Sequence, residues 1–64
     1  MSDIRALEEC REFARRQFRL TQQPTFLVSL DHGEDGYDYD VLVEEELNEP
    51  YFKAFDGVII EAFE

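Results

Sequence analysis

Residues 25–44 read TFLVSLDHGEDGYDYDVLVE, and their pattern indicates the central part of the fold. Two runs within this stretch, 25–31 and 37–44, are rich in β-branched and aromatic residues. Within each run, the side chains fall on two alternating sides of an extended chain. A period of two residues predicts β-strands. The HGEDG segment between the runs supplies turn-forming residues, so we expect an antiparallel hairpin.

The second strand of this hairpin separates its side chains by type. One face carries Tyr37, Tyr39, Val41 and Val43, and the other carries Asp38, Asp40, Leu42 and Glu44. This alternation is typical of a sheet with one buried and one solvent-exposed face. We expect Tyr37 and Tyr39 to cover the core, and the acidic side chains to form a regular row spaced by about 6.7 Å between successive same-face positions.

The segment before the hairpin predicts a helix over residues 3–20. Its apolar side chains recur at spacings of three and four, which is the pattern of an amphipathic helix. The predicted apolar stripe consists of Ile4, Leu7, Cys10, Ala14 and Phe18, widened by Phe13 and Leu20.

The segment after the hairpin predicts a short helix and a third strand. Asn48 can cap the helix and Pro50 is tolerated in its first turn. Core-facing positions there are Leu47, Tyr51, Phe52 and Phe55, and the last strand covers residues 58–63. The whole chain, residues 1–64, is therefore predicted to be one small α+β domain of order α-β-β-α-β. Its first helix packs on a three-stranded, mainly antiparallel sheet.

Composition limits the function. The 64 residues include 16 Asp or Glu and 6 Lys or Arg, so the net charge is −10, with a pI near 4.3. Phosphate backbones and anionic lipids attract cations, so direct nucleic-acid and membrane binding are disfavoured. The beginning of the sequence lacks a signal-peptide pattern, no apolar run is long enough to span a membrane, and there is a single cysteine. We therefore expect a cytoplasmic protein.

The charge is concentrated after the first helix. Residues 1–20 carry a net +1 and residues 21–64 carry −11, and residues 31–49 hold nine carboxylates without Lys or Arg. One interpretation of this acidic run needs no partner: the carboxylates keep the chain soluble, protect a sheet edge from pairing, or adapt the protein to high salt. The run can also dock on a basic surface built for phosphates, which is nucleic-acid mimicry.

The functional hypothesis is a non-enzymatic acidic module that binds a basic protein, of the kind that binds nucleic acid, and inhibits or regulates it. In general composition the chain is similar to small phage-encoded antagonists, although it carries no family motif. Two alternatives stay open: a small assembly protein that forms homodimers or larger oligomers through its apolar last strand, and a weak divalent-cation site in residues 31–40. The predicted contact residues are Asp35, Asp38, Asp40, Glu44, Glu45, Glu46 and Glu49.

Other motifs point to no chemistry. An EF-hand alignment of residues 31–42 places Gly33 and Leu42 at ligand positions, so that motif is rejected. Cys10 lies on the apolar stripe and is interpreted as a small core residue. His32 is expected to be exposed at the hairpin tip. No nucleophile motif or glycine-rich phosphate loop is present, so we expect neither catalysis nor a cofactor.

Overall fold

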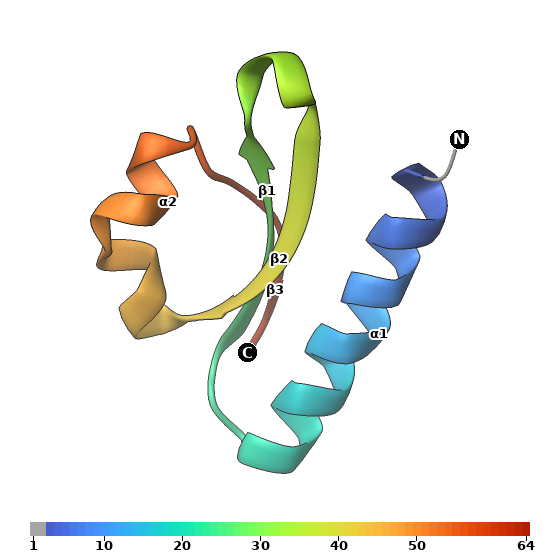
Figure 1. Ribbon diagram of the computed structural model, residues 1–64. Coiled ribbons are helices and arrows are strands. Elements are labelled where there is room, and N and C mark those ends of the chain that lie inside the picture. Colours follow the sequence, from blue (N-terminus) through green and yellow to red (C-terminus); the bar gives the residue numbers. More distant parts are fainter. Residues whose placement is uncertain (1–2) are drawn as a thin grey trace.

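The structure is a computed structural model that describes residues 3–64 (Figure 1). It confirms the predicted α+β class and the order α-β-β-α-β, with two additional 3₁₀ turns. Among the described residues, no helix is both long enough and apolar enough to cross a membrane. The elements in chain order are α1 (Asp3–Thr21), β1 (Thr25–Asp31), η1 (Gly33–Asp35), β2 (Tyr37–Val43), η2 (Glu44–Asn48), α2 (Pro50–Ala54) and β3 (Val58–Phe63).

The sheet has the order β2-β1-β3, and both neighbouring pairs are antiparallel. The first strand of the hairpin is therefore the central strand, and β2 and β3 form the two edges. The β1–β2 register is regular along the whole of β1, whereas the β1–β3 register shifts between Leu27 and Val28. Leu27 pairs with Glu61 and Val28 with Ile59, so Ile60 is the extra residue of a β-bulge.

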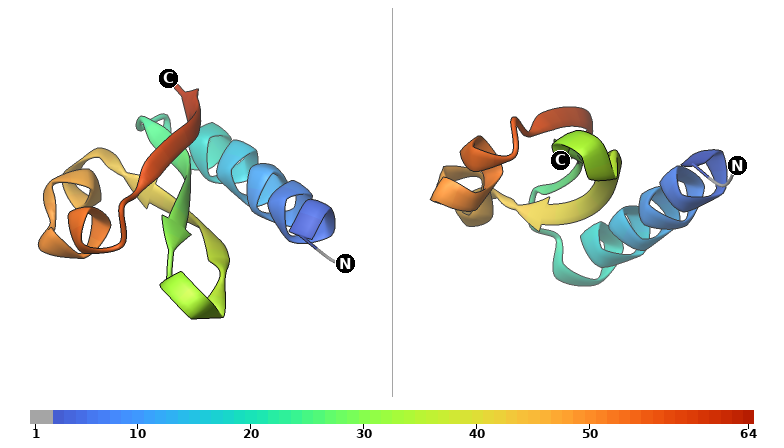
Figure 2. Two further views of the ribbon diagram at one scale, coloured as in Figure 1. Left: turned by 90° about the horizontal axis from the view of Figure 1, so that it is seen from above. Right: turned by 45° about the horizontal axis from the view of Figure 1, so that its top comes forward.

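Both faces of the sheet are covered. Figures 1 and 2 show α1 on one side of the strands and the η2–α2 segment on the other. The cluster on the η2–α2 side consists of Val28, Leu30 and Leu42, packed against Phe26, Leu47, Phe52 and Phe55.

The expectation of one solvent-exposed face was therefore wrong. Asp40 pairs with Val28 and Asp38 with Leu30, so these two carboxylates share the face that η2 and α2 cover. The alternation in β2 reported the two faces correctly. It could not indicate that Leu47, Phe52 and Phe55 pack over the face that was expected to be exposed to solvent.

The α1 side has a narrower core. Ala14 and Leu27 are completely buried, whereas Phe13 and Leu20, expected on the same stripe, are 53% and 73% exposed. At 3.6 residues per turn, each of these two lies roughly a third of a turn from the direction of Ala14. These two side chains therefore point away from the direction in which Ala14 is buried, and the apolar face that α1 buries is narrower than its sequence predicts.

The cap of the short helix lies one residue later than predicted. Glu49 is the residue before α2, Pro50 occupies the first turn, and Asn48 ends η2. Leu47, Phe52 and Phe55 face the core as expected, but Tyr51 is 41% exposed. After α2, a Cβ at Gly57 would collide with the ring of Phe52, so any larger residue at this turn into β3 would have to displace that ring.

Candidate functional site

The hairpin turn is tied to the core through its histidine. Gly33 and Gly36 adopt φ of 70° and 89°, which lets the chain reverse around η1. The ring of His32 lies 4.4 Å from that of Phe55, and its Nε2 atom is 3.2 Å from Oδ2 of Asp38. His32 is therefore half-buried, and the expectation that it is exposed at the tip was wrong. Its aromatic contact, Phe55, lies 23 positions away, which local sequence could not indicate.

Asp40 is held by internal hydrogen bonds. The backbone N–H of Val41 donates to Oδ1 of Asp40 at 2.8 Å, and the hydroxyl of Tyr51 donates to Oδ2 at 3.1 Å. Partial burial raises the pKa of Tyr51 above its ordinary value of 10.0, and the hydrogen bond to Asp40 and the charge of Asp40 act in the same direction. This carboxylate thus holds β2 and α2 together.

Glu46 has a similar structural role at the last residue of β2. The backbone N–H of Val43 donates to Oε1 of Glu46 at 2.9 Å. Val41 and Val43 direct their N–H groups to carboxylates and not to β1, so these are donors on the outer side of an edge strand. Asp40 and Glu46 therefore cap the β2 edge with the chain's own side chains.

The other predicted contact residues are exposed but do not form one row. Asp35 and Asp38 lie at the hairpin tip, whereas Glu44, Glu45 and Glu49 lie at η2 and the start of α2. Because β2 ends at Val43, Glu44 belongs to η2, and the expected strand row of three carboxylates is broken. The six-residue separation of Asp38 and Glu44 corresponds to about 20 Å along an extended chain.

The exposed glutamates at the start of η2, Glu44 and Glu45, border a hollow of about 390 Å³, which we call the η2 hollow. Both glutamates line it, and no ion pair or side-chain hydrogen bond engages their carboxylates within residues 3–64. The connection between α1 and β1 supplies the opposite wall. The lining residues are Thr21, Gln23, Pro24, Val43, Glu44, Glu45 and Asn48. Sequence reasoning found the two glutamates but missed the opposite wall, which lies about 20 residues earlier in the chain.

A second, shallower hollow of about 470 Å³ lies between α1 and the β2 edge and includes Cys10, Phe13 and Val41. Partial burial raises the pKa of the Cys10 thiol above its ordinary value of 9.0, and the negative charges of Asp40 and Glu9 act likewise. The thiol is therefore held in its protonated, weakly nucleophilic form at neutral pH. Cys10 is half-buried, as a residue at the margin of the core.

The two tyrosines of β2 differ from one another. Tyr39 is half-buried, but Tyr37 is 68% exposed, so the expectation that both cover the core fails for Tyr37. Tyr37 is the first residue of the strand and pairs with Asp31 at the end of the hairpin, beyond the closely packed part of the sheet. Across the described part of the chain, no group of three His, Cys, Asp or Glu residues converges to hold a metal ion, residues 31–40 included.

No protein-family model matches this chain, and comparisons with curated proteins and with solved structures gave no significant match. The functional inference therefore depends on the surface chemistry of the chain itself.

Proposed function

We propose that this protein is an acidic binding module that docks on a basic protein surface of the kind that binds nucleic acid, and so blocks or regulates it. The observation that carries the proposal is the η2 hollow, a concave surface lined by two exposed glutamates together with polar residues. A guanidinium or ammonium group is the natural occupant of such a hollow. Carboxylates accept its hydrogen bonds, and the amide oxygens of Gln23 and Asn48 can complete them.

The charge distribution supports the same proposal. The segment 21–64 carries −11, and its exposed carboxylates lie at both ends of β2. A basic surface with arginines or lysines about 20 Å apart can therefore be contacted at two points, the hairpin tip and the η2 hollow. Electrostatic attraction over that area speeds association and favours cationic partners over neutral ones.

The test uses proteins captured from the cell of origin by the immobilised full chain. Captured proteins are eluted first with a NaCl gradient and, in a parallel experiment, with a short DNA duplex. We expect elution at moderate salt and displacement by the duplex, because partner and nucleic acid compete for one basic site. Capture that neither salt nor the duplex reverses contradicts the proposal.

A pair of matched variants locates the surface. Glu44→Lys with Glu45→Lys inverts both carboxylates of the η2 hollow, and Glu8→Lys with Glu9→Lys makes the same change in net charge on α1, where both residues are exposed. We expect the first pair to lose most of the captured protein and the second to keep it. Equal loss from both pairs would mean that only overall charge matters, and the η2 hollow would have no special role.

A further inference from the structure

The two edges of the sheet differ in how their backbone is protected. On β2, Val41 and Val43 direct N–H groups outward, and the carboxylates of Asp40 and Glu46 accept both. An edge strand otherwise presents a row of unpaired donors and acceptors to any extended chain. Because its own side chains occupy these two donors, the second half of β2 is a poor template for a further strand.

The β3 edge has no equivalent protection. Within residues 3–64, no side chain caps a backbone donor of β3. At the bulge, Ile60 is the extra residue with no opposite residue in β1, so the strand ladder is interrupted there. The edge is also apolar, because Val58, Ile59 and Ile60 are consecutive and are 58%, 46% and 40% exposed.

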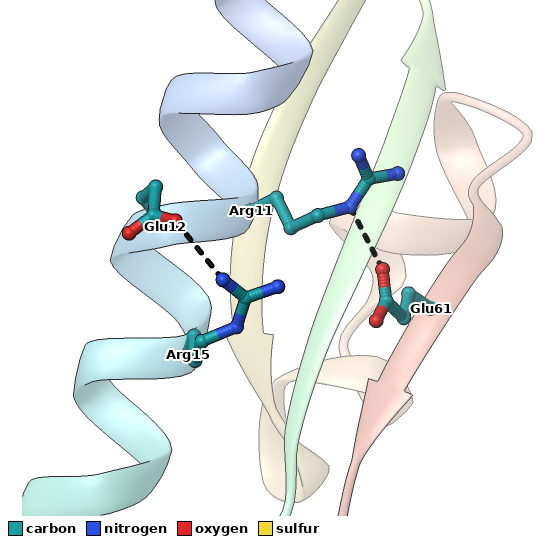
Figure 3. Close-up of polar contacts among 4 residues, drawn as sticks. All are labelled: Arg11, Glu12, Arg15 and Glu61. Carbon is teal, nitrogen blue, oxygen red and sulfur yellow. Dashed lines mark hydrogen bonds and ion pairs between the residues drawn. The ribbon is translucent and has the colours of Figure 1, made fainter.

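The only charge within β3 is turned away from this edge. Glu61 lies opposite Leu27, on the α1 side of the sheet, and its Oε1 atom accepts a hydrogen bond of 2.8 Å from Nε of Arg11 (Figure 3). Arg11 extends from α1 across β1 to make this contact. The pair neutralises the carboxylate and leaves an edge of apolar side chains and backbone groups.

The acidic residues at the two ends of β3 determine which kind of strand can pair with its edge. Asp56 precedes β3 and Glu64 follows it, and both are exposed. A second copy paired antiparallel about Ile60 would bring Asp56 of each molecule next to Glu64 of the other, and each molecule also carries a net −10. Like charges opposite one another destabilise paired strands, so self-pairing is the unfavourable choice.

We propose that the β3 edge is a docking surface for an extended segment of a different protein, apolar in its centre and bearing Lys or Arg at both ends. The segment adds a strand to the sheet, so that its backbone pairs with β3 while its apolar side chains cover Val58, Ile59 and Ile60. Its cationic ends lie beside Asp56 and Glu64. This surface is separate from the η2 hollow, and the proposal does not depend on the function proposed above.

The probe is a synthetic peptide, acetyl-Lys-Val-Thr-Val-Thr-Val-Lys-amide, added to the full chain labelled with ¹⁵N. We expect the backbone amide signals of Val58–Phe63 to shift, and those of Val41 and Val43 to stay. Two further peptides test the chemistry. Replacing both lysines by glutamate should weaken binding about fivefold or more, because the charges then repel. Replacing the central valine by proline should abolish it, because proline cannot join the strand ladder.

Two variants of equal charge change test the location. Val58→Lys places a cation on the β3 edge and should weaken binding of the lysine-ended peptide about fivefold, whereas Tyr37→Lys on the exposed start of β2 should leave it unchanged. The peptide comparisons need only the unmodified protein, so they decide the proposal even if a variant folds poorly. Shifts centred on β2, equal binding of the proline peptide, or a stable dimer through β3 in sedimentation without peptide would each overturn the proposal.

Discussion

The β2 and β3 strands lie on opposite edges of one small sheet and pair with the same central strand, yet their surfaces differ in kind. The β2 edge is acidic, and two of its outward donors, the N–H groups of Val41 and Val43, are capped by Asp40 and Glu46. The β3 edge is apolar, bulged and uncapped by any described side chain, and its one internal charge is neutralised by Arg11. The excess negative charge is therefore found along the β2 edge much more than along the β3 edge.

The carboxylates of this small chain have two different uses. Two of the seven predicted contact residues, Asp40 and Glu46, protect backbone donors of an edge strand and fix the elements that follow it. The other five are exposed, and these are the carboxylates that we propose contact a partner. Structural carboxylates and proposed contact carboxylates are thus interspersed along a single segment, and each kind can be removed separately.

The largest expected effect concerns the turn that leads into the β3 edge. Gly57→Ala places a methyl group against the ring of Phe52, which packs on the core cluster. We expect a loss of about 2 kcal/mol in the free energy of unfolding, measured with urea, because overpacking forces side chains or backbone to shift. Combining it with Phe52→Leu should cost less than the sum of the two single changes. A Gly57→Ala variant as stable as the unmodified protein would show that the turn adapts freely.

The next effect concerns the cap of the β2 edge. Glu46→Ala removes the acceptor of the Val43 N–H, and we expect a loss of about 1 kcal/mol in the free energy of unfolding. Glu45→Ala, beside it in η2, removes an exposed carboxylate without such a bond and should change stability by less than about 0.5 kcal/mol. Equal effects of the two substitutions would contradict the assignment of Glu46 as a cap.

A smaller effect is expected for the ion pair that neutralises the β3 edge. A double-mutant cycle with Arg11→Met and Glu61→Gln should give a coupling free energy of about 0.5–1 kcal/mol, because both side chains are only partly buried. The exposed Arg15–Glu12 pair, three residues apart on α1 (Figure 3), is the reference and should give about 0.3 kcal/mol. The same coupling for both pairs would mean that the longer-range contact adds nothing to the fold.

The smallest effect is a dependence on alkaline pH at the Tyr51–Asp40 contact. The folded protein favours the neutral phenol, so the raised pKa of Tyr51 contributes stability that is fully present below pH 10, the ordinary pKa. That stability is lost as the pH rises through the higher pKa of the folded protein. Between pH 9 and pH 11 the urea midpoint should therefore fall further for the unmodified protein than for Tyr51→Phe. Tyr37→Phe serves as the control, and it should follow the unmodified protein.

Local patterns predicted the elements of this fold well. The period of two in residues 25–31 and the β-branched run at 58–63 gave both strands their observed bounds, and α1 extends one residue beyond its predicted end. These boundaries depend on neighbouring side chains and turn residues, which a sequence displays directly.

What the sequence could not predict is how distant segments meet. The burial of His32 against Phe55, the exposure of Phe13 and the second covered face of the sheet all follow from tertiary packing. The same holds for the candidate site. The acidic residues were visible as a run, but the division between capping and exposed carboxylates depends on where η2 begins and on backbone donors that no residue pattern marks.

Amide hydrogen exchange in the unmodified protein tests the contrast between the edges most directly. If carboxylates cap β2, the outward amides of Val41 and Val43 exchange slowly despite lying on an edge strand. The outward amides of β3, with no such acceptor, exchange at least about tenfold faster. Outward amides of both edges that exchange at the same rate would contradict the account, because the two edges would then be equally open.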